Sequence, residues 1–188
     1  YVLNLSKNLK AQNPVLMVPK AANDYKEEAD QFDKSMPFKT VRVDFFWWIY
    51  PRWFKTFFLA RKVVKKERCD TLLIHHCLPI GHIGYIFKKV FRFPYWIFFH
   101  GTDLEMASFS ASKKRRTGNI LKTADRVIVN SEFLKNKLLE KFPKVKAEKI
   151  TVLHPCPANE FFVSYPSEEL ESLRSKLALG GKKVVLTV

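Results

Sequence analysis

The chain has 188 residues, a length that favours one domain with some sequence left over. It is 47% hydrophobic and 27% charged, which excludes wholesale disorder. Its 33 Lys and Arg residues against 18 Asp and Glu give a net charge of +15, so we expect an anionic partner such as nucleic acid, a phospholipid surface or a phosphorylated small molecule. Three cysteines without paired spacing argue against a disulfide-bonded secreted domain, and no apolar run is long enough to span a bilayer.

Helical and extended patterns alternate along the chain. In the first half they predict a helix at residues 1–9, a strand at 14–19, a loop or short exposed helix at 22–35, a strand at 40–45, a helix at 52–68, a strand at 71–75 and a helix at 84–90. In the second half they predict a strand at 94–99, a helix that follows the basic residues 113–116 and ends at Thr123, a strand at 126–130, a helix at 132–142 capped by Ser131, a strand at 150–153 and a helix at 167–178.

Strands that alternate with helices predict βαβ units, and hence an α/β fold with a parallel sheet covered by helices on both faces. Such folds normally open with a strand, so we expect a further strand upstream of Tyr1. After the helix at 167–178, residues 182–188 repeat a buried-strand pattern. A single strand cannot bury itself, so this tail is interpreted as the first strand of a second domain.

The helix predicted at residues 52–68 carries different side chains on different faces. The face expected to pack on the sheet consists of Trp53, Phe57, Ala60 and Val64. The flank combines two aromatic and two basic residues, Phe54, Phe58, Arg61 and Lys65. Aromatic rings beside cations suit the headgroup region of an anionic membrane, which predicts a membrane-facing surface here. The alternative is that both phenylalanines belong to the core and the basic residues are solvated.

Two polar clusters follow predicted strands, where parallel α/β sheets bind their ligands. In the first, Gly101 allows close approach of the backbone, and His100, Thr102 and Asp103 offer groups that bind hydroxyls or phosphate. Its alternative is an ordinary strand-to-helix turn with Asp103 as a cap. The second cluster, Asn130, Ser131 and Glu132, is better explained by a plain helix cap, with ligand binding as the alternative.

Two further clusters involve histidine and cysteine. His75, His76, Cys77 and His82 match no standard spacing of metal ligands, so no metal site is predicted. His82 lies beside Gly81 near a helix start, where both could instead contact a bound sugar or phosphate. Every second residue in the segment 154–157 is proline, and this segment is interpreted as a hinge between domains.

In this order, the segments at residues 69–75, 78–81, 98–103, 124–134, 149–153 and 177–188 resemble the N-terminal half of a family 4 glycosyltransferase of the GT-B fold. That resemblance implies a Rossmann-like, acceptor-side domain at residues 1–157, a linker and helix at 158–181, and the first strand of a C-terminal, donor-binding domain at 182–188. It also implies a retaining enzyme that transfers a sugar from a nucleotide-sugar without a metal or other cofactor, and a fragment that is inactive alone.

The resemblance places His100 in the transfer cleft as the catalytic residue. Substrate contacts are then expected from Gly81, His82, Gly101, Thr102, Asp103, Asn130, Ser131 and Glu132. The basic charge adds the expectation of a lipid-linked or cell-envelope acceptor and of a cytoplasmic enzyme, peripheral on the inner face of the cell membrane.

Two alternatives belong to other classes of protein. A basic Rossmann-like module could bind nucleic acid through the aromatic and basic residues of the segment 47–68, but no nucleic-acid motif is present, and we do not expect this partner. A nicotinamide-dependent dehydrogenase needs a G-x-G-x-x-G turn, which the sequence lacks.

Overall fold

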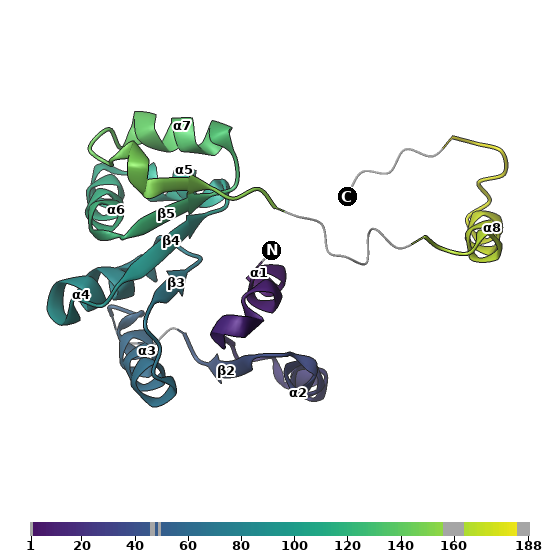
Figure 1. The fold of residues 1–188 in the computed structure, drawn as a ribbon, viewed down its shortest axis with the longest axis horizontal. Coiled ribbons are helices and arrows are strands. Elements are labelled where there is room, and N and C mark those ends of the chain that lie inside the picture. The colour runs from purple at the N-terminus through teal and green to yellow at the C-terminus, as the bar shows by residue number, and fades with distance from the viewer. Residues whose placement is uncertain (1, 46–47, 49, 156–163, 184–188) are drawn as a thin grey trace. The chain divides into compact units, whose positions relative to one another are not determined.

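The computed structural model describes residues 2–45, 48, 50–155 and 164–183 (Figure 1). The chain divides into two compact units, Tyr1–Pro155 and Cys156–Val188. Within the described residues, no helix is long and apolar enough to cross a membrane.

The first unit alternates strands and helices, as predicted. Its strands are β1 (Val15–Pro19), β2 (Lys39–Val43), β3 (Leu72–Ile74), β4 (Tyr95–Phe99), β5 (Arg126–Val129) and β6 (Ile150–Val152). Its α-helices are α1 (Val2–Asn8), α2 (Lys26–Ser35), α3 (Phe54–Glu67), α4 (Gly81–Phe91), α5 (Thr102–Ser108), α6 (Ala111–Thr123) and α7 (Glu132–Lys141). In the second unit, α8 spans Ser167–Lys176.

The strands form two parallel sheets, one of order β1–β2 and one of order β3–β4–β5–β6. In the larger sheet Ile97 of β4 lies opposite Ile74 of β3 and Val127 of β5, and Val127 in turn lies opposite Ile150 of β6. The smaller sheet is tied to α3 by an ion pair of 2.7 Å between Lys39 and Glu67. These parallel sheets, flanked by helices, confirm the predicted α/β fold class.

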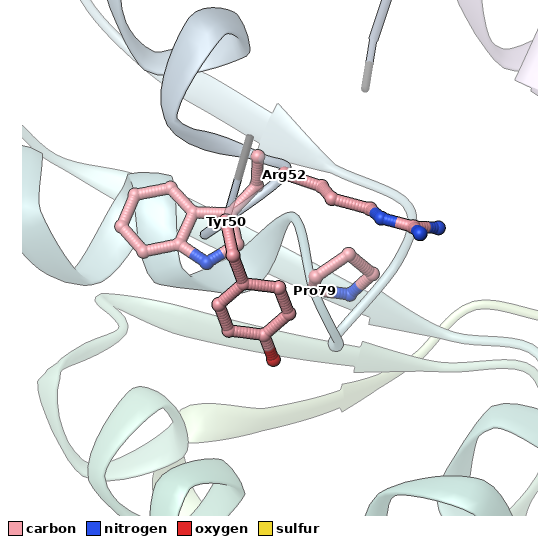
Figure 2. A pocket seen from close by; sticks show the side chains of 4 residues that line it. Tyr50, Arg52 and Pro79 are labelled. Atoms are coloured by element: carbon pink, nitrogen blue, oxygen red, sulfur yellow. The ribbon is translucent and has the colours of Figure 1, made fainter. Parts of the chain in front are cut away.

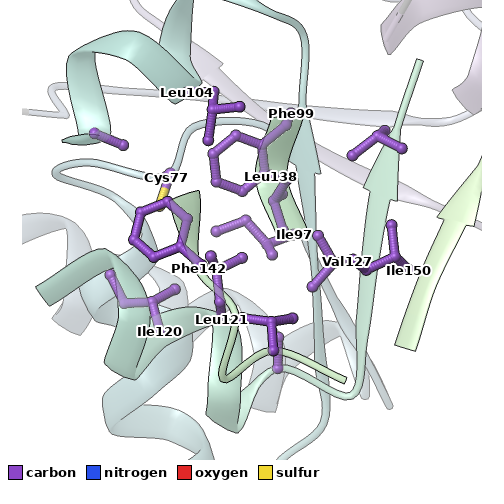
Figure 3. Packing of buried hydrophobic residues seen from close by; sticks show 14 of the residues in the cluster. Cys77, Ile97, Phe99, Leu104, Ile120, Leu121, Val127, Leu138, Phe142 and Ile150 are labelled. Carbon is purple, nitrogen blue, oxygen red and sulfur yellow. The ribbon is translucent and has the colours of Figure 1, made fainter. Parts of the chain in front are cut away.

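The main core lies on one face of β4 and β5, with side chains from α5, α6 and α7 packed against it (Figure 3), and Phe98 and Ile128 are buried on the other face. Burial on both faces explains why these strands are continuous apolar runs in the sequence. Its largest fully buried side chains include Tyr95, Ile97, Phe99, Leu104, Ile120, Leu121, Leu138, Val127 and Val129. The Tyr95 hydroxyl donates to the carbonyl of Ile120 at 2.5 Å, which satisfies the polar end of a ring that burial would otherwise leave unpaired.

A second cluster fixes α3 against α4. Its buried members are Ala60, Ile83 and Phe87, with Trp53, Phe57 and Val64 among the partly buried side chains around them. The predicted inner face of α3 is therefore confirmed. It packs chiefly on α4, with Leu72 of β3 and Met17 of β1 beside it.

Two helical details differ from the sequence-based expectations. Helix α6 begins at Ala111, so the basic residues 113–116 lie inside it rather than before it; the Ser110 hydroxyl accepts from the backbone N–H of Lys113 and provides the cap. The seven-residue helix α5 was not predicted, because so short a segment shows barely two turns of periodicity. Of the strand predicted at 182–188, residues 184–188 lie outside the described part of the chain.

Two helical glycines provide a matched test of this packing. A Cβ on Gly84 would lie 2.5 Å from Cδ2 of Tyr95 and 2.6 Å from Cδ1 of Ile74, whereas one on Gly118 would lie 3.8 Å from Cδ1 of Phe142. We expect Gly84→Ala to lower the free energy of unfolding by about 1–3 kcal/mol through overpacking. Gly118→Ala should raise it by roughly 0.5–1 kcal/mol through helix propensity. Urea denaturation of both variants measures these changes. Equal effects of the two substitutions on the free energy of unfolding would contradict the close α4–sheet contact.

Candidate functional site

The candidate site lies at the carboxyl edge of the larger sheet, where β4 ends. The backbone N–H groups of His100 and Gly101 both donate to Oδ1 of Asp103, each at 3.0 Å. Gly101 has φ of +120°, a conformation that glycine adopts without strain, and α5 begins at the next residue. The other carboxylate oxygen of Asp103 is buried and has no hydrogen-bond partner in the described part of the chain. Asp103 thus closes the turn that presents His100.

The loop after β5 is tied to this turn by side chains. The Asn130 amide donates to the carbonyl of His100 at 3.2 Å, and the Ser131 hydroxyl lies 3.3 Å from Oδ1 of Asn130. The Ser131 hydroxyl also accepts from the backbone N–H of Leu134 at 3.2 Å, which confirms Ser131 as the N-cap of α7. The two polar clusters singled out in the sequence therefore meet in one place.

A third strand end contributes His75, whose contact with His100 the sequence analysis missed. Nδ1 of His75 lies 3.3 Å from Nε2 of His100, and the two rings are stacked within 12° of parallel. The other stacking partner of His75 is Phe98, at 4.2 Å between ring centroids. Both histidines directly follow neighbouring strands, so the adjacency of β3 and β4 is the signal that could have found the pair.

Burial affects the charge of both rings. The pKa of His75 is lowered to about 4, chiefly by burial and in smaller part by the neighbouring His100. Burial also lowers the pKa of His100, while the negative charge of Asp103 acts in the opposite direction. Both imidazoles are therefore neutral near pH 7. A neutral imidazole donates through one nitrogen and accepts through the other, which suits a hydrogen bond between the rings.

A pocket of about 260 Å³ opens at these loops. Its lining residues are His100, Gly101, Thr102, Glu105, Asn130, Ser131, Phe133, Leu134 and Lys137. The structure thus gathers five of the predicted site residues around one cavity. The predicted Glu132 is exposed, does not line this cavity, and pairs with Lys135 at 3.4 Å.

The charged wall of this pocket is not apparent from the sequence pattern. The Glu105 carboxylate forms ion pairs of 2.6 Å with both Lys137 and Lys141, and these hydrogen bonds lower its pKa to about 2. It therefore remains ionised throughout the neutral range. Glu105 lies on α5, whereas Lys137 and Lys141 lie on α7, and a sequence pattern does not show which helices face each other.

A second pocket, of about 320 Å³, lies near the start of α4 (Figure 2). Its lining residues are Tyr50, Arg52, Trp53 and Pro79. The predicted contact residue His82 stacks on Trp53 at 5.4 Å between ring centroids, and its Nδ1 donates to the carbonyl of Pro79 at 2.9 Å. Gly81 is buried against Ile97 and Ile120, which gives this glycine a packing role.

The histidine and cysteine cluster does not assemble into a metal site. Among the described residues no group of three or more His, Cys, Asp or Glu side chains could hold a metal ion. Cys77 is fully buried, which raises the pKa of its thiol to about 12, and its Sγ lies 3.9 Å from Oγ1 of Thr117. His76, by contrast, is exposed.

A parallel α/β domain with polar groups gathered at its carboxyl edge defines a Rossmann-like ligand-binding domain. Residues 1–156 match the family described as Glycosyltransferase Family 4, and the chain belongs to this family. No curated protein matches the sequence.

Solved glycosyltransferases share the fold. HepE (Alr3699) of Anabaena in complex with UDP has a TM-score of 0.67 and 18% identity, and covers 95% of this chain and 45% of its own. Its complex with UDP-glucose matches with a TM-score of 0.67 and 16% identity, over 96% of this chain and 46% of that one. A glycosyltransferase from Rickettsia africae matches with a TM-score of 0.68 and 18% identity, over 94% of this chain and 44% of that one. The chain thus spans less than half the length of these structures, which have the GT-B fold.

The lowered pKa of His75 makes stability depend on pH. At pH values between about 4 and 6.5, the ordinary pKa of this side chain, His75 binds a proton in the unfolded chain but not in the folded chain. The free energy of unfolding therefore has its full value above pH 6.5. As the pH falls from there to about 4, it decreases by at most about 3 kcal/mol because of His75. We expect His75→Gln to reduce the loss, measured by urea denaturation at several pH values across this window.

The exposed His154 supplies the control. His154→Gln should retain the full pH dependence of the wild-type chain, since this side chain lies on the surface. Equal slopes in the wild type and in His75→Gln would show that the buried histidine does not govern stability in this range.

Proposed function

We propose that this chain is the acceptor-side half of an enzyme that transfers a sugar from a nucleotide-sugar to an acceptor, with retention of configuration and without a metal. The observation that carries the proposal is the convergence of His100, Gly101 and Asn130 on one cavity at the carboxyl edge of the sheet. Membership of a glycosyltransferase family and the UDP and UDP-glucose named in the complexes of a structural neighbour support it.

In this proposal His100 contacts the transferred sugar. Its side chain is exposed at the sheet edge, and its ring is kept in place by His75 and by the turn that Asp103 closes. A neutral imidazole can hydrogen-bond a sugar hydroxyl without adding a charge beside a developing cation at the sugar. Gly101, which has no side chain, lets the substrate approach the backbone of the turn.

The remaining parts of the enzyme follow from the family. A second, C-terminal domain would bind the nucleotide of the donor, so that the sugar lies between the two domains and this fragment alone transfers nothing. The net charge of +15 supports an anionic ligand or surface as a partner of this half.

Replacement of His100 tests this role in the full-length protein. We expect His100→Ala to lower turnover about 100-fold, as loss of a well-placed polar contact does in other enzymes. Thermal stability should change little, because the side chain is exposed. The exposed His76 provides the control, and His76→Ala should leave turnover unchanged. Residual activity that follows the folded fraction would instead make His100 a structural residue.

We further propose that the enzyme works at the cytoplasmic face of the membrane on a lipid-linked or cell-envelope acceptor. Phe54 and Phe58 of α3 are 41% and 51% exposed, so they are not core residues. Together with Arg61 and Lys65 they form one aromatic–basic stripe at helical spacing, and Arg61 lies over the ring of Phe91 at 5.3 Å. Such a stripe suits lipid headgroups, because rings bury while cations meet phosphate.

Vesicle sedimentation tests the membrane surface. Binding should rise with the fraction of anionic lipid and fall with salt, since each basic residue near the surface contributes about 1 kcal/mol. The variant Phe54→Ser, Phe58→Ser, Lys65→Glu should bind several-fold less. A control with comparable changes on α2 and at the residue before it, Tyr25→Ser, Phe32→Ser, Lys34→Glu, should bind like the wild type. Equal binding to neutral and anionic vesicles would contradict the proposal.

A further inference from the structure

The pocket of Tyr50, Arg52, Trp53 and Pro79 is separate from the cavity at His100, since among the described residues the two have no lining residue in common. Its walls come from the segment between β2 and α3 and from the turn between β3 and α4 (Figure 2). A volume of about 320 Å³ is at the small end of the range for ligand pockets. It suits one sugar ring with a small substituent rather than an extended chain.

Aromatic surface makes up much of this pocket. The Tyr50 side chain is 82% exposed, so its ring is accessible to a ligand in the pocket. Trp53 is fixed from behind, because His82 stacks on it at 9° from parallel and is itself held by the carbonyl of Pro79. Large apolar faces with a polar tip, such as tyrosine and tryptophan provide, are well suited to partly apolar, partly polar ligands such as sugars.

The positive charge of Arg52 is not neutralised by the segment that carries it. Only two acidic residues, Asp44 and Glu67, occur between residues 44 and 67. Lys20 and Lys55 occupy Asp44 at 2.9 and 3.4 Å, and Lys39 occupies Glu67. No ion pair joins Arg52 to a carboxylate within the described ranges. An exposed guanidinium in the wall of an aromatic pocket is suited to bind a phosphate group through two parallel N–H groups.

We propose that this pocket binds the acceptor and that the acceptor is a sugar bearing a phosphate: the sugar ring rests on Tyr50 and Trp53, and the phosphate meets Arg52. This assignment rests on the proposed function and names the substrate class of the acceptor side. The position is consistent with it, because Pro79 lies in the loop that follows His75, and His75 contacts His100. Neighbouring strands are about 4.8 Å apart, so the loop after β3 is the immediate neighbour of the turn that carries His100.

Calorimetric titration of the full-length protein tests the pocket without requiring sugar transfer. The probes are glucose 1-phosphate, the diester octyl glucosyl phosphate, glucose and inorganic phosphate. We expect both phosphorylated sugars to bind at least ten-fold more tightly than glucose or phosphate alone. Tighter binding of the diester supports a lipid-linked acceptor, and tighter binding of the monoester supports a free sugar phosphate.

Substitutions then locate the binding. Arg52→Gln should weaken the binding of both phosphorylated sugars about ten-fold. Tyr50→Ala should weaken the part of their binding that depends on the sugar ring. Arg115→Gln, which removes an exposed arginine from α6, is the matched control and should have no effect. Unchanged binding in Arg52→Gln, an equal loss in Arg115→Gln, or no preference for phosphorylated sugars would overturn the proposal.

The two proposals fail in different ways. If transfer proceeds and the KM for the acceptor is unchanged in Arg52→Gln, the pocket assignment is wrong while the enzymatic function stands. If phosphorylated sugars bind through Arg52 but no nucleotide-sugar supports transfer, the binding pocket stands and the proposed function fails.

Discussion

The burial of β4 and β5 on both faces is the constraint on which the rest of the structure depends. Ile97, Phe99, Val127 and Val129 are buried on one face of the sheet and Phe98 and Ile128 on the other, as is usual for parallel strands joined by helical crossovers. Parallel strands end at the same edge. The polar residues that follow each strand, His75, His100 and Asn130, are therefore brought together without any direct attraction between them.

What gathers at this edge is an ordered hydrogen-bond network around two neutral histidines. Backbone N–H groups satisfy one oxygen of Asp103, the Asn130 amide satisfies the carbonyl of His100, and the two histidines share a hydrogen-bond distance while remaining neutral. Charge is placed further out, where Glu105 is held between Lys137 and Lys141. The site thus presents directed donors and acceptors, which is what recognition of hydroxyl groups requires.

Most of the fold could be predicted from the sequence because its elements are strongly patterned. The apolar run of β4, the inner face of α3 and the Ser131 cap depend on local spacing, and each was identified from it. The contact between His75 and His100, by contrast, depends on which strands are neighbours. The pocket at Tyr50 depends on two loops that are 29 positions apart between Tyr50 and Pro79, and periodicity says nothing about such a distance. Local chemistry was visible in the sequence, and the pairing of loops was not.

The turn at Gly101 has a consequence that concerns handedness rather than space. Nothing lies within 4 Å of where a Cβ would stand, so a side chain there has room. The obstacle is the backbone itself, with φ of 120° and ψ of −79°, which L residues rarely adopt. The mirror image of this conformation lies near the extended region that L residues favour. A D-amino acid would therefore fit the position, and the achiral glycine is the one genetically encoded residue that can take its place.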